Sequence, residues 1–282
     1  MIKLKKLDFN YGKKAPLFNG LSGHFEAGNI YGLLGKNGAG KTTLLKCISG
    51  LLLTDPSQAI ILGKSSTHRH ADILSELIFI PEEFYTPDMT AKEYLLSYAP
   101  FYPAFDHKRM KSIMNEFELK IDEDLNNYSY GMKKKFLIAF ALSSGTRILL
   151  LDEPTNGLDI PSKSQFRKVL AGSLRDDQLI IISTHQVRDM KQLIDPIVII
   201  DAGRILLNSD LQTISEKLQV SESETLPDDE NILYSEDIFG KYTLVKKNQK
   251  EKVSKPIDLE LLFNTVIAKP EWFMDNFSGG AK

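Results

Sequence analysis

The chain has 282 residues, of which 42% are hydrophobic and 26% charged, and its formal net charge is -2. This length suits one large domain with an appendage, or two modest domains. The charge balance argues against nucleic acid as the main partner, because such proteins usually carry a basic surface excess. The longest apolar runs fall far short of the ~20 residues that a membrane-spanning helix needs, and residues 1–12 lack the apolar stretch of a signal peptide, so we expect a soluble protein.

The N-terminal part of the chain predicts three strands and a helix. Residues 2–9 alternate loosely between apolar and polar, as a strand with one solvated face does, and a second strand is expected over 21–25. A short apolar strand at 30–34 leads into a glycine-rich turn at 35–40. Leucine and isoleucine then recur at helical spacing, which predicts a helix from 42 to 52. The order strand, glycine-rich turn, helix is the context that a phosphate-binding loop requires.

The middle of the chain changes character from about residue 82 to residue 141. Its apolar positions follow a helical period interrupted by prolines, so we predict a mostly helical insert in an α/β core. After the insert the core resumes, with short apolar strands predicted at 147–152, 179–183 and 197–201 and helices predicted at 162–174 and 186–193. Strands that alternate with helices in this way are typical of a parallel sheet.

Beyond about residue 208 the composition shifts again. Residues 221–231 are acidic and poor in apolar side chains, which predicts an exposed loop. A strand is expected at 242–245, followed by a basic run at 246–255 and a short amphipathic helix over 257–267. This segment therefore predicts a small extension that contains both strand and helix.

Residues 35–42, GKNGAGKT, match the phosphate-binding pattern G-x-x-x-x-G-K-[ST] without departure. Glycines let such a loop turn its backbone N–H groups toward phosphate oxygens, and the positive N-terminal end of the following helix adds to the attraction. Lys41 is placed to reach the β- and γ-phosphates, and Thr42 offers its hydroxyl to magnesium. The candidate nucleotide ligands are Gly35, Lys36, Asn37, Gly38, Ala39, Gly40, Lys41, Thr42 and Thr43.

A second motif supplies two carboxylates. The apolar strand at 148–151 ends in Asp152 and Glu153, at the carboxyl edge where sheets of this kind bind their ligands. Asp152 can hold a magnesium ion through water, and Glu153 can act as general base on an attacking water. The alternative is a pair of acidic residues that merely cap a strand. We disfavour it because both motifs fall where phosphoryl transfer needs them.

With these motifs the sequence resembles the nucleotide-binding domain of ABC transporters over about residues 1–215. The most specific stretch is LLLDEPTNGLD at 149–159. The resemblance implies that Asp159 lies on a loop that crosses a dimer interface. It also implies that His185, in the sequence STH, contacts the γ-phosphate and that Tyr11 stacks on the adenine.

The family's signature sequence, usually LSGGQ, corresponds here to YSYGM at 128–132. Ser129 and Gly131 keep the hydroxyl and the backbone N–H at a helix start that can bind a γ-phosphate. Tyr130 replaces a glycine, which affects how closely two subunits can approach. We interpret the following run of lysines, 133–135, as a solvated helix face.

Glu82, in the sequence FIPEEF, stands where the family more often has glutamine. A carboxylate at this position can still reach magnesium, and it changes the hydrogen bonds offered to the attacking water. The nearby Tyr85, Met89 and Tyr94 are candidate contacts for a membrane partner, with the core of the insert as an equally weighted alternative.

The resemblance implies an α/β fold with a P-loop NTPase core and a mostly parallel sheet. It also implies an antiparallel N-terminal β subdomain, an inserted α-helical subdomain and a small C-terminal α+β extension. We divide the chain into an ATP-binding domain at 1–210, with the insert at about 82–141, and an accessory extension at 211–282.

The implied activity is ATP hydrolysis with ATP and Mg²⁺, in a head-to-tail dimer with a second copy or a homologous ATPase subunit. The output would pass to a separate transmembrane permease, with export favoured, from a cytoplasmic position on the inner face of the cell membrane. A soluble ABC-type ATPase with a non-transport or regulatory role is the alternative. The departures at Tyr130 and Glu82 keep that alternative open, whereas Glu153 and His185 argue for full turnover.

Overall fold

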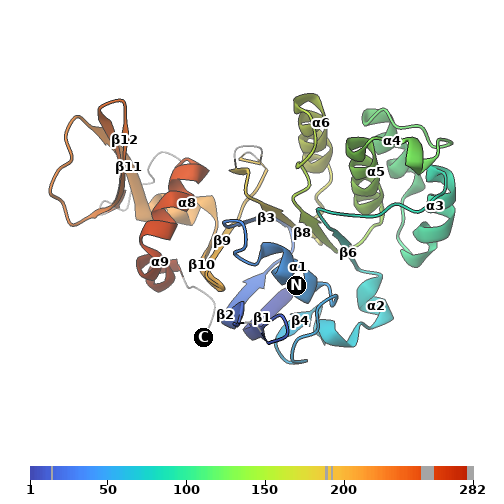
Figure 1. Ribbon diagram of the computed structural model, residues 1–282, viewed down its shortest axis with the longest axis horizontal. Helices are drawn as coiled ribbons and strands as arrows, with labels where there is room; N and C mark the ends of the chain where they lie inside the picture. The colour runs from blue at the N-terminus through green and yellow to red at the C-terminus, as the bar shows by residue number, and fades with distance from the viewer. Residues whose placement is uncertain (14, 188–189, 192, 249–256, 278–282) are drawn as a thin grey trace.

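The computed structural model describes residues 1–13, 15–187, 190–191, 193–248 and 257–277, and its centre is a six-stranded sheet (Figure 1). In sheet order the strands are β10 (Arg204–Ser209), β9 (Ile197–Asp201), β3 (Asn29–Leu34), β8 (Leu179–Thr184), β7 (Ile148–Asp152) and β6 (Leu77–Ile80). All neighbours run parallel except β10, which is antiparallel to β9. Every residue of β7 and β8 is buried, as the near-continuous apolar runs predicted.

The N-terminal residues form a separate antiparallel sheet, as predicted. Its strands, in order, are β2 (Phe18–Phe25), β1 (Ile2–Phe9), β4 (Ala59–Ile61) and β5 (Lys64–Ser65). The alternation of β1 is interrupted near Lys6, where the φ angle is 46 and the register with β2 shifts. On β2, a Cβ at Gly23 would lie 2.7 Å from Ile205 Cδ1. Glycine at this position therefore lets the N-terminal sheet pack closely against β10.

Helix α1 (Lys41–Ile48) follows the glycine-rich turn and packs its apolar side chains against the N-terminal sheet. It ends before the predicted residue 52 because Gly50 has a φ angle of 70, a left-handed conformation that terminates helices. A Cβ on Gly50 would lie 2.5 Å from the carbonyl oxygen of Ser66, so a larger residue does not fit. The single cysteine, Cys47, is fully buried in α1, and burial raises the pKa of its thiol to about 12.

Between β6 and β7 the chain forms the predicted helical insert. It consists of α3 (Ala91–Tyr98), α4 (His107–Glu116) and α5 (Tyr130–Ser143), joined by the 3-10 turns η2 (Ala99–Phe101) and η3 (Leu125–Asn127). Two shorter elements, η1 (Ser66–His68) and α2 (Ala71–Leu74), precede β6. α5 packs against α4 and against β6, so it joins the insert to the edge of the parallel sheet.

Helix α6 (Ile160–Ala171) connects β7 to β8 and confirms the helix predicted over 162–174, with shifted ends. It starts earlier because Asp159 caps its N-terminus and Pro161 suits the first turn. It ends before Gly172. The helix predicted over 186–193 falls partly on residues 188–189 and 192, which lie outside the described residues.

The C-terminal extension contains α7 (Leu211–Lys217), β11 (Leu218–Ser223), β12 (Ile232–Ile238), β13 (Lys241–Lys247), α8 (Leu259–Ala268) and α9 (Pro270–Phe277). Its three strands form an antiparallel sheet in the order β11-β13-β12. The strand predicted at 242–245 lies within β13, and the helix predicted over 257–267 is α8. The loop expected at 221–231 is shorter, because residues 221–223 pair with β13 as the end of β11. Part of the basic run, 249–255, lies outside the described residues.

The extension lies beside β9 and β10, at the opposite end of the central sheet from the insert (Figure 1). Its buried side chains, such as Leu262 and Phe273, join the same apolar core as the parallel sheet and the insert. The division of the chain at residues 210 and 211 stays a prediction. Among the described residues, no helix combines the length and the apolar character needed to cross a membrane.

Candidate nucleotide-binding and catalytic site

The glycine-rich turn between β3 and α1 requires glycine at specific positions. Gly40 has a φ angle of 102, and a Cβ there would lie 2.7 Å from Phe18 Cε1. A Cβ on Gly35 would lie 2.7 Å from the carbonyl oxygen of Ile200. The turn therefore sits tightly against the sheet, and its shape depends on the absence of side chains at both positions.

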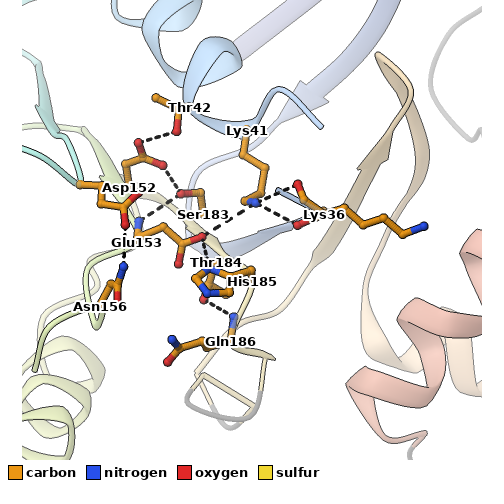
Figure 2. Close-up of polar contacts among 12 residues, drawn as sticks. Lys36, Lys41, Thr42, Asp152, Glu153, Asn156, Ser183, Thr184, His185 and Gln186 are labelled. Carbon is orange, nitrogen blue, oxygen red and sulfur yellow. Dashed lines mark hydrogen bonds and ion pairs between the residues drawn. The ribbon is translucent and has the colours of Figure 1, made fainter. Parts of the chain in front are cut away.

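Lys41 folds back over this turn. Its Nζ donates to the carbonyl oxygens of Gly35, at 2.8 Å, and Lys36, at 3.3 Å. Burial lowers the pKa of Lys41, and the nearby carboxylates of Glu153 and Asp152 oppose that shift. The ammonium is thus held inside the loop, whereas the Lys36 side chain extends away from the cluster (Figure 2).

Asp152 ends β7 and links the two strands and the helix that border the site. It is buried, and its Oδ2 accepts a hydrogen bond of 2.8 Å from the Thr42 hydroxyl at the start of α1. Its Oδ1 accepts from the hydroxyl of Ser183, its direct neighbour across the β7–β8 pair. Both carboxylate oxygens therefore have a fixed direction (Figure 2).

Glu153 follows Asp152 and has a φ angle of 45, a left-handed conformation that is costly for a residue with a side chain. Its N–H donates to the carbonyl oxygen and to the hydroxyl of Ser183, both at 3.1 Å. This turn directs its buried carboxylate to His185, with 2.8 Å between Oε1 and Nδ1, and leaves Oε1 3.9 Å from Lys41 Nζ. A carboxylate held between a lysine and a histidine at the edge of a phosphate loop can act as a general base.

These groups line one pocket of about 650 Å³. Its walls are Tyr11, Leu17, Asn37, Gly38, Gly40, Lys41, Thr42, Thr43, Glu82, Glu153, Asn156 and His185. Of the residues that the sequence indicated for the nucleotide and the metal, most are in that set, and Asp152 lies directly behind Thr42. Tyr11 is half exposed at the rim, and its hydroxyl shares a 2.9 Å hydrogen bond with the Thr43 hydroxyl.

Ser129, Gly131 and Asp159 do not line this pocket. Ser129 caps the N-terminus of α5 by accepting a 3.2 Å hydrogen bond from Met132 N–H. Asp159 caps α6 in the same way, and hydrogen bonds from the hydroxyl and N–H of Ser162 lower the pKa of its carboxyl. The three residues therefore lie at the starts of α5 and α6, outside the pocket that the phosphate loop at 35–42 borders.

The two departures from the family pattern touch each other. The Tyr130 hydroxyl donates to the carbonyl oxygen of Glu82 at 2.7 Å, and the Tyr130 ring stacks on Phe84 with 5.1 Å between centroids. The Glu82 carboxylate accepts a 2.6 Å hydrogen bond from the Asn156 amide. The two residues are 48 positions apart in the sequence, so no local pattern predicts this contact.

The expectation that lysines 133–135 form a solvated face is wrong for Lys134. Its side chain is fully buried, and its Nζ donates to the carbonyl oxygens of Glu153, at 2.8 Å, and Asn156, at 3.0 Å. Helical spacing gave no signal for this burial, because Lys133 and Lys135 also lie four residues before buried side chains, those of Leu137 and Ala139. Ser183 and Asn156 were also missed, although both lie within motifs that were recognised.

Comparisons with known proteins agree with this geometry. A family model described as ABC transporter matches residues 18–156. The ABC transporter ATP-binding protein NatA of Bacillus subtilis is 32% identical over 200 residues, which cover 68% of this chain and 80% of that protein. The Nod factor export ATP-binding protein I of Burkholderia lata is 32% identical over 209 residues, covering 72% of this chain and 68% of that one.

Among solved structures, an ATP-binding subunit of an ABC transporter superposes with a TM-score of 0.69 at 25% identity, covering 76% of this chain and 91% of that chain. The two chains therefore share the same overall fold over about three quarters of this chain. A family model matches the chain, the alignment with NatA covers 80% of that protein, and one pocket joins the two motifs. The chain therefore belongs to the ABC transporter family, as an ATP-binding protein that hydrolyses ATP.

Proposed function

We propose that this protein is the ATPase subunit of a transporter and that ATP binds in the 650 Å³ pocket with its phosphates on residues 35–42. The observation that carries the proposal is the convergence of Lys41, Glu153 and His185 from separate strand ends on one pocket. Tyr11 stands at the rim, where its ring can cover the adenine. Lys41 is placed to neutralise phosphate charge from inside the loop.

The donors beside the phosphate loop fit a magnesium ion. Mg²⁺ prefers oxygen ligands and is usually bound by one or two carboxylates together with substrate phosphates. The Thr42 hydroxyl can keep donating to Asp152 while its lone pair faces the ion, and Glu82 supplies a further carboxylate on the pocket wall. Within the described residues no cluster of three His, Cys, Asp or Glu side chains that could hold a metal ion is found. When bound, Mg²⁺ would neutralise charge on the phosphates.

Glu153 is the base in this proposal. Its carboxylate is buried and points into the pocket, so it can take a proton from a water placed opposite the γ-phosphate. His185, 2.8 Å away, orients that carboxylate by donating from Nδ1, and in its protonated form it can also donate to a phosphate oxygen from Nε2.

A second subunit would complete the site. Ser129 and Gly131 lie at the exposed start of α5, where a γ-phosphate held by another copy can bind to the helix N-terminus. Asp159, at the exposed start of α6, is placed to cross the same interface. A head-to-tail dimer with a second copy or a homologous subunit brings these residues to the partner's cradle.

A groove of about 810 Å³ is the proposed docking site for a separate permease. It lies between α2 and β6 on one side and α3 and η2 on the other, and aromatic residues such as Tyr94, Tyr98 and Phe101 line it. Phe101 is 69% exposed, an unusual state for a large apolar side chain beside other aromatics. Of the other contacts suggested by sequence, Tyr85 is exposed but outside the groove, and Met89 packs on the core.

The permease would hold this chain at the inner face of the membrane. The name of the Burkholderia relative, an export protein, supports export as the direction. A soluble ATPase without a permease is the second candidate, and the departures at Tyr130 and Glu82 favour it. Co-purification from membranes separates the two candidates. If the parent protein retains a membrane protein that a charged substitution in the groove releases, the result supports transport. If no membrane protein co-purifies with the parent, the result counts against transport.

The substitution Glu153→Gln tests the site itself. We expect ATP binding to persist while turnover falls by roughly 10³-fold, because the amide cannot accept the proton of the attacking water. We also expect ATP to trap a dimer, visible by size-exclusion chromatography. Turnover at the parental rate would show that Glu153 is not the base.

A further inference from the structure

Lys134 is a charged residue whose side chain is completely buried, on the second turn of α5. Burial of an ammonium is costly unless hydrogen bonds replace its hydration. The proposed mechanism gives it no part, since it does not line the nucleotide pocket. Its position therefore needs an explanation of its own.

The Lys134 ammonium donates hydrogen bonds to the backbone at both ends of the turn from Glu153 to Asn156. Nζ donates to the carbonyl oxygen of Glu153 at 2.8 Å and to that of Asn156 at 3.0 Å. The same turn is closed by a 3.1 Å hydrogen bond from Asn156 N–H to the Glu153 carbonyl. The ammonium is thus hydrogen-bonded to the backbone of the segment that follows β7.

That segment includes the strained residue of the site. Glu153 has a φ angle of 45, a conformation that persists only when surrounding contacts hold it. Ser183 accepts the Glu153 N–H on one side, and Lys134 donates to the Glu153 carbonyl on the other. The direction of the Glu153 side chain toward His185 follows from this backbone.

We propose that Lys134 is a positioning residue for ATP hydrolysis: its ammonium fixes the turn from Glu153 to Asn156 and so aims the Glu153 carboxylate into the pocket. This inference rests on the proposed role of Glu153 as the base. Lys134 touches neither the nucleotide pocket nor the reacting atoms, so it acts through the backbone of Glu153.

The carboxylates and the aromatic ring around Lys134 partly offset the cost of burying its cation. Burial lowers the pKa of Lys134, and the carboxylates of Glu82, Glu153 and Asp152 oppose that shift. The ring of Tyr130 lies 5.6 Å from Nζ and offers its face to the cation.

The test compares Lys134→Met with Lys133→Met in the full-length protein. Lys133 lies on the same helix but is partly exposed, and within the described residues its side chain has no hydrogen bond, so it is a matched control. For Lys134→Met we expect kcat to fall by roughly 100-fold, as misplacement of a catalytic group by about 1 Å does, while the Kd for ATP stays within about threefold. Lys133→Met should stay within about twofold in both.

Two further variants exclude a merely structural role. Lys134→Arg keeps a cation with several donors and should recover part of the lost kcat. Lys134→Gln carries a neutral amide that is too short to reach both carbonyl oxygens, so it should lower kcat without weakening ATP binding. If Lys134→Met does not fold, Lys134→Gln tests the positioning role in its place. Parental kcat in a folded Lys134→Met or Lys134→Gln, or an equal loss of kcat and ATP affinity, would overturn the inference.

A double-mutant cycle with Glu153→Gln shows whether Lys134 acts through the base. Single-turnover hydrolysis of labelled ATP should be no slower in Glu153→Gln/Lys134→Met than in Glu153→Gln, because there is no longer a base to aim. A further 100-fold loss would mean that Lys134 acts elsewhere, which overturns the inference and leaves the base intact. Parental turnover in Glu153→Gln alone would instead overturn the proposed base.

Discussion

The nucleotide pocket and the aromatic groove hold their side chains in opposite ways. Glu153 in the pocket and Asp152 behind it are both buried, and each makes several hydrogen bonds or ion pairs, so their directions are set before any ligand arrives. In the groove, Tyr98 is 38% and Phe101 69% exposed. The difference indicates that the pocket is preorganised for a small charged ligand, whereas the groove presents apolar surface suited to a protein partner.

One helix connects the two regions. α5 begins at Tyr130, which contacts Glu82 at the pocket wall, and carries Phe140 into the lining of the groove. Strand β6 makes the same connection, since Ile80 lines the groove and Glu82 follows two residues later. Substitutions inside the pocket or the groove should therefore affect mainly that region, whereas a substitution at the Tyr130–Glu82 contact tests the connection between them.

The largest effect is expected from Lys41→Ala in the pocket. Loss of the ammonium leaves the phosphate charge without its cation inside the loop, so ATP affinity should weaken by roughly 30-fold or more and turnover should vanish. Binding is measured by equilibrium titration with a fluorescent nucleotide, with Lys46→Ala as the control because Lys46 lies in the last turn of the same helix and does not line the pocket. An unchanged ATP affinity would contradict the assignment of the cradle.

A change confined to the groove comes next. Phe101→Asp places a charge among aromatic side chains that are proposed to contact the permease. We expect the ATPase rate of the isolated protein to stay within about twofold, since Phe101 is exposed and remote from Glu153, while retention of the membrane partner falls about tenfold or more. Pull-down from detergent-solubilised membranes measures the partner. If Phe101→Asp and the parent retain it equally, the groove is not the docking site.

The smallest effect is expected from a change at the contact between Tyr130 and Glu82, which connects the two regions. Tyr130→Phe removes the hydroxyl that donates to the Glu82 carbonyl but keeps the ring that stacks on Phe84. A neutral hydrogen bond contributes about 1 kcal/mol, and water can replace it at this exposed position, so we expect the free energy of unfolding to fall by no more than that. Chemical denaturation measures this change. A loss several times larger would show that the contact organises the region beyond one hydrogen bond.

The parts of the site that could be predicted from sequence are those made by short contiguous stretches. The cradle at 35–42 is specified locally, because glycine at Gly35 and Gly40 and the lysine at Lys41 lie within one turn. Asp152 and Glu153 could be placed at a strand end because the apolar run before them marks a buried strand. The helical insert and the antiparallel N-terminal sheet were also predicted, whereas the extra strands of the extension were not, since acidic edge strands resemble loops.

The remaining features depend on contacts between distant segments. Lys134 belongs to a run of lysines that looks solvated, and only the turn at Glu153, 19 residues later, makes its burial favourable by offering two carbonyl oxygens. Tyr130 and Glu82, 48 positions apart, meet because α5 packs against β6. The sequence by itself determined which chemical groups the protein brings to ATP. Only the tertiary structure decided how the base is aimed, because backbone carbonyls and buried cations find their partners through packing and not through any local pattern.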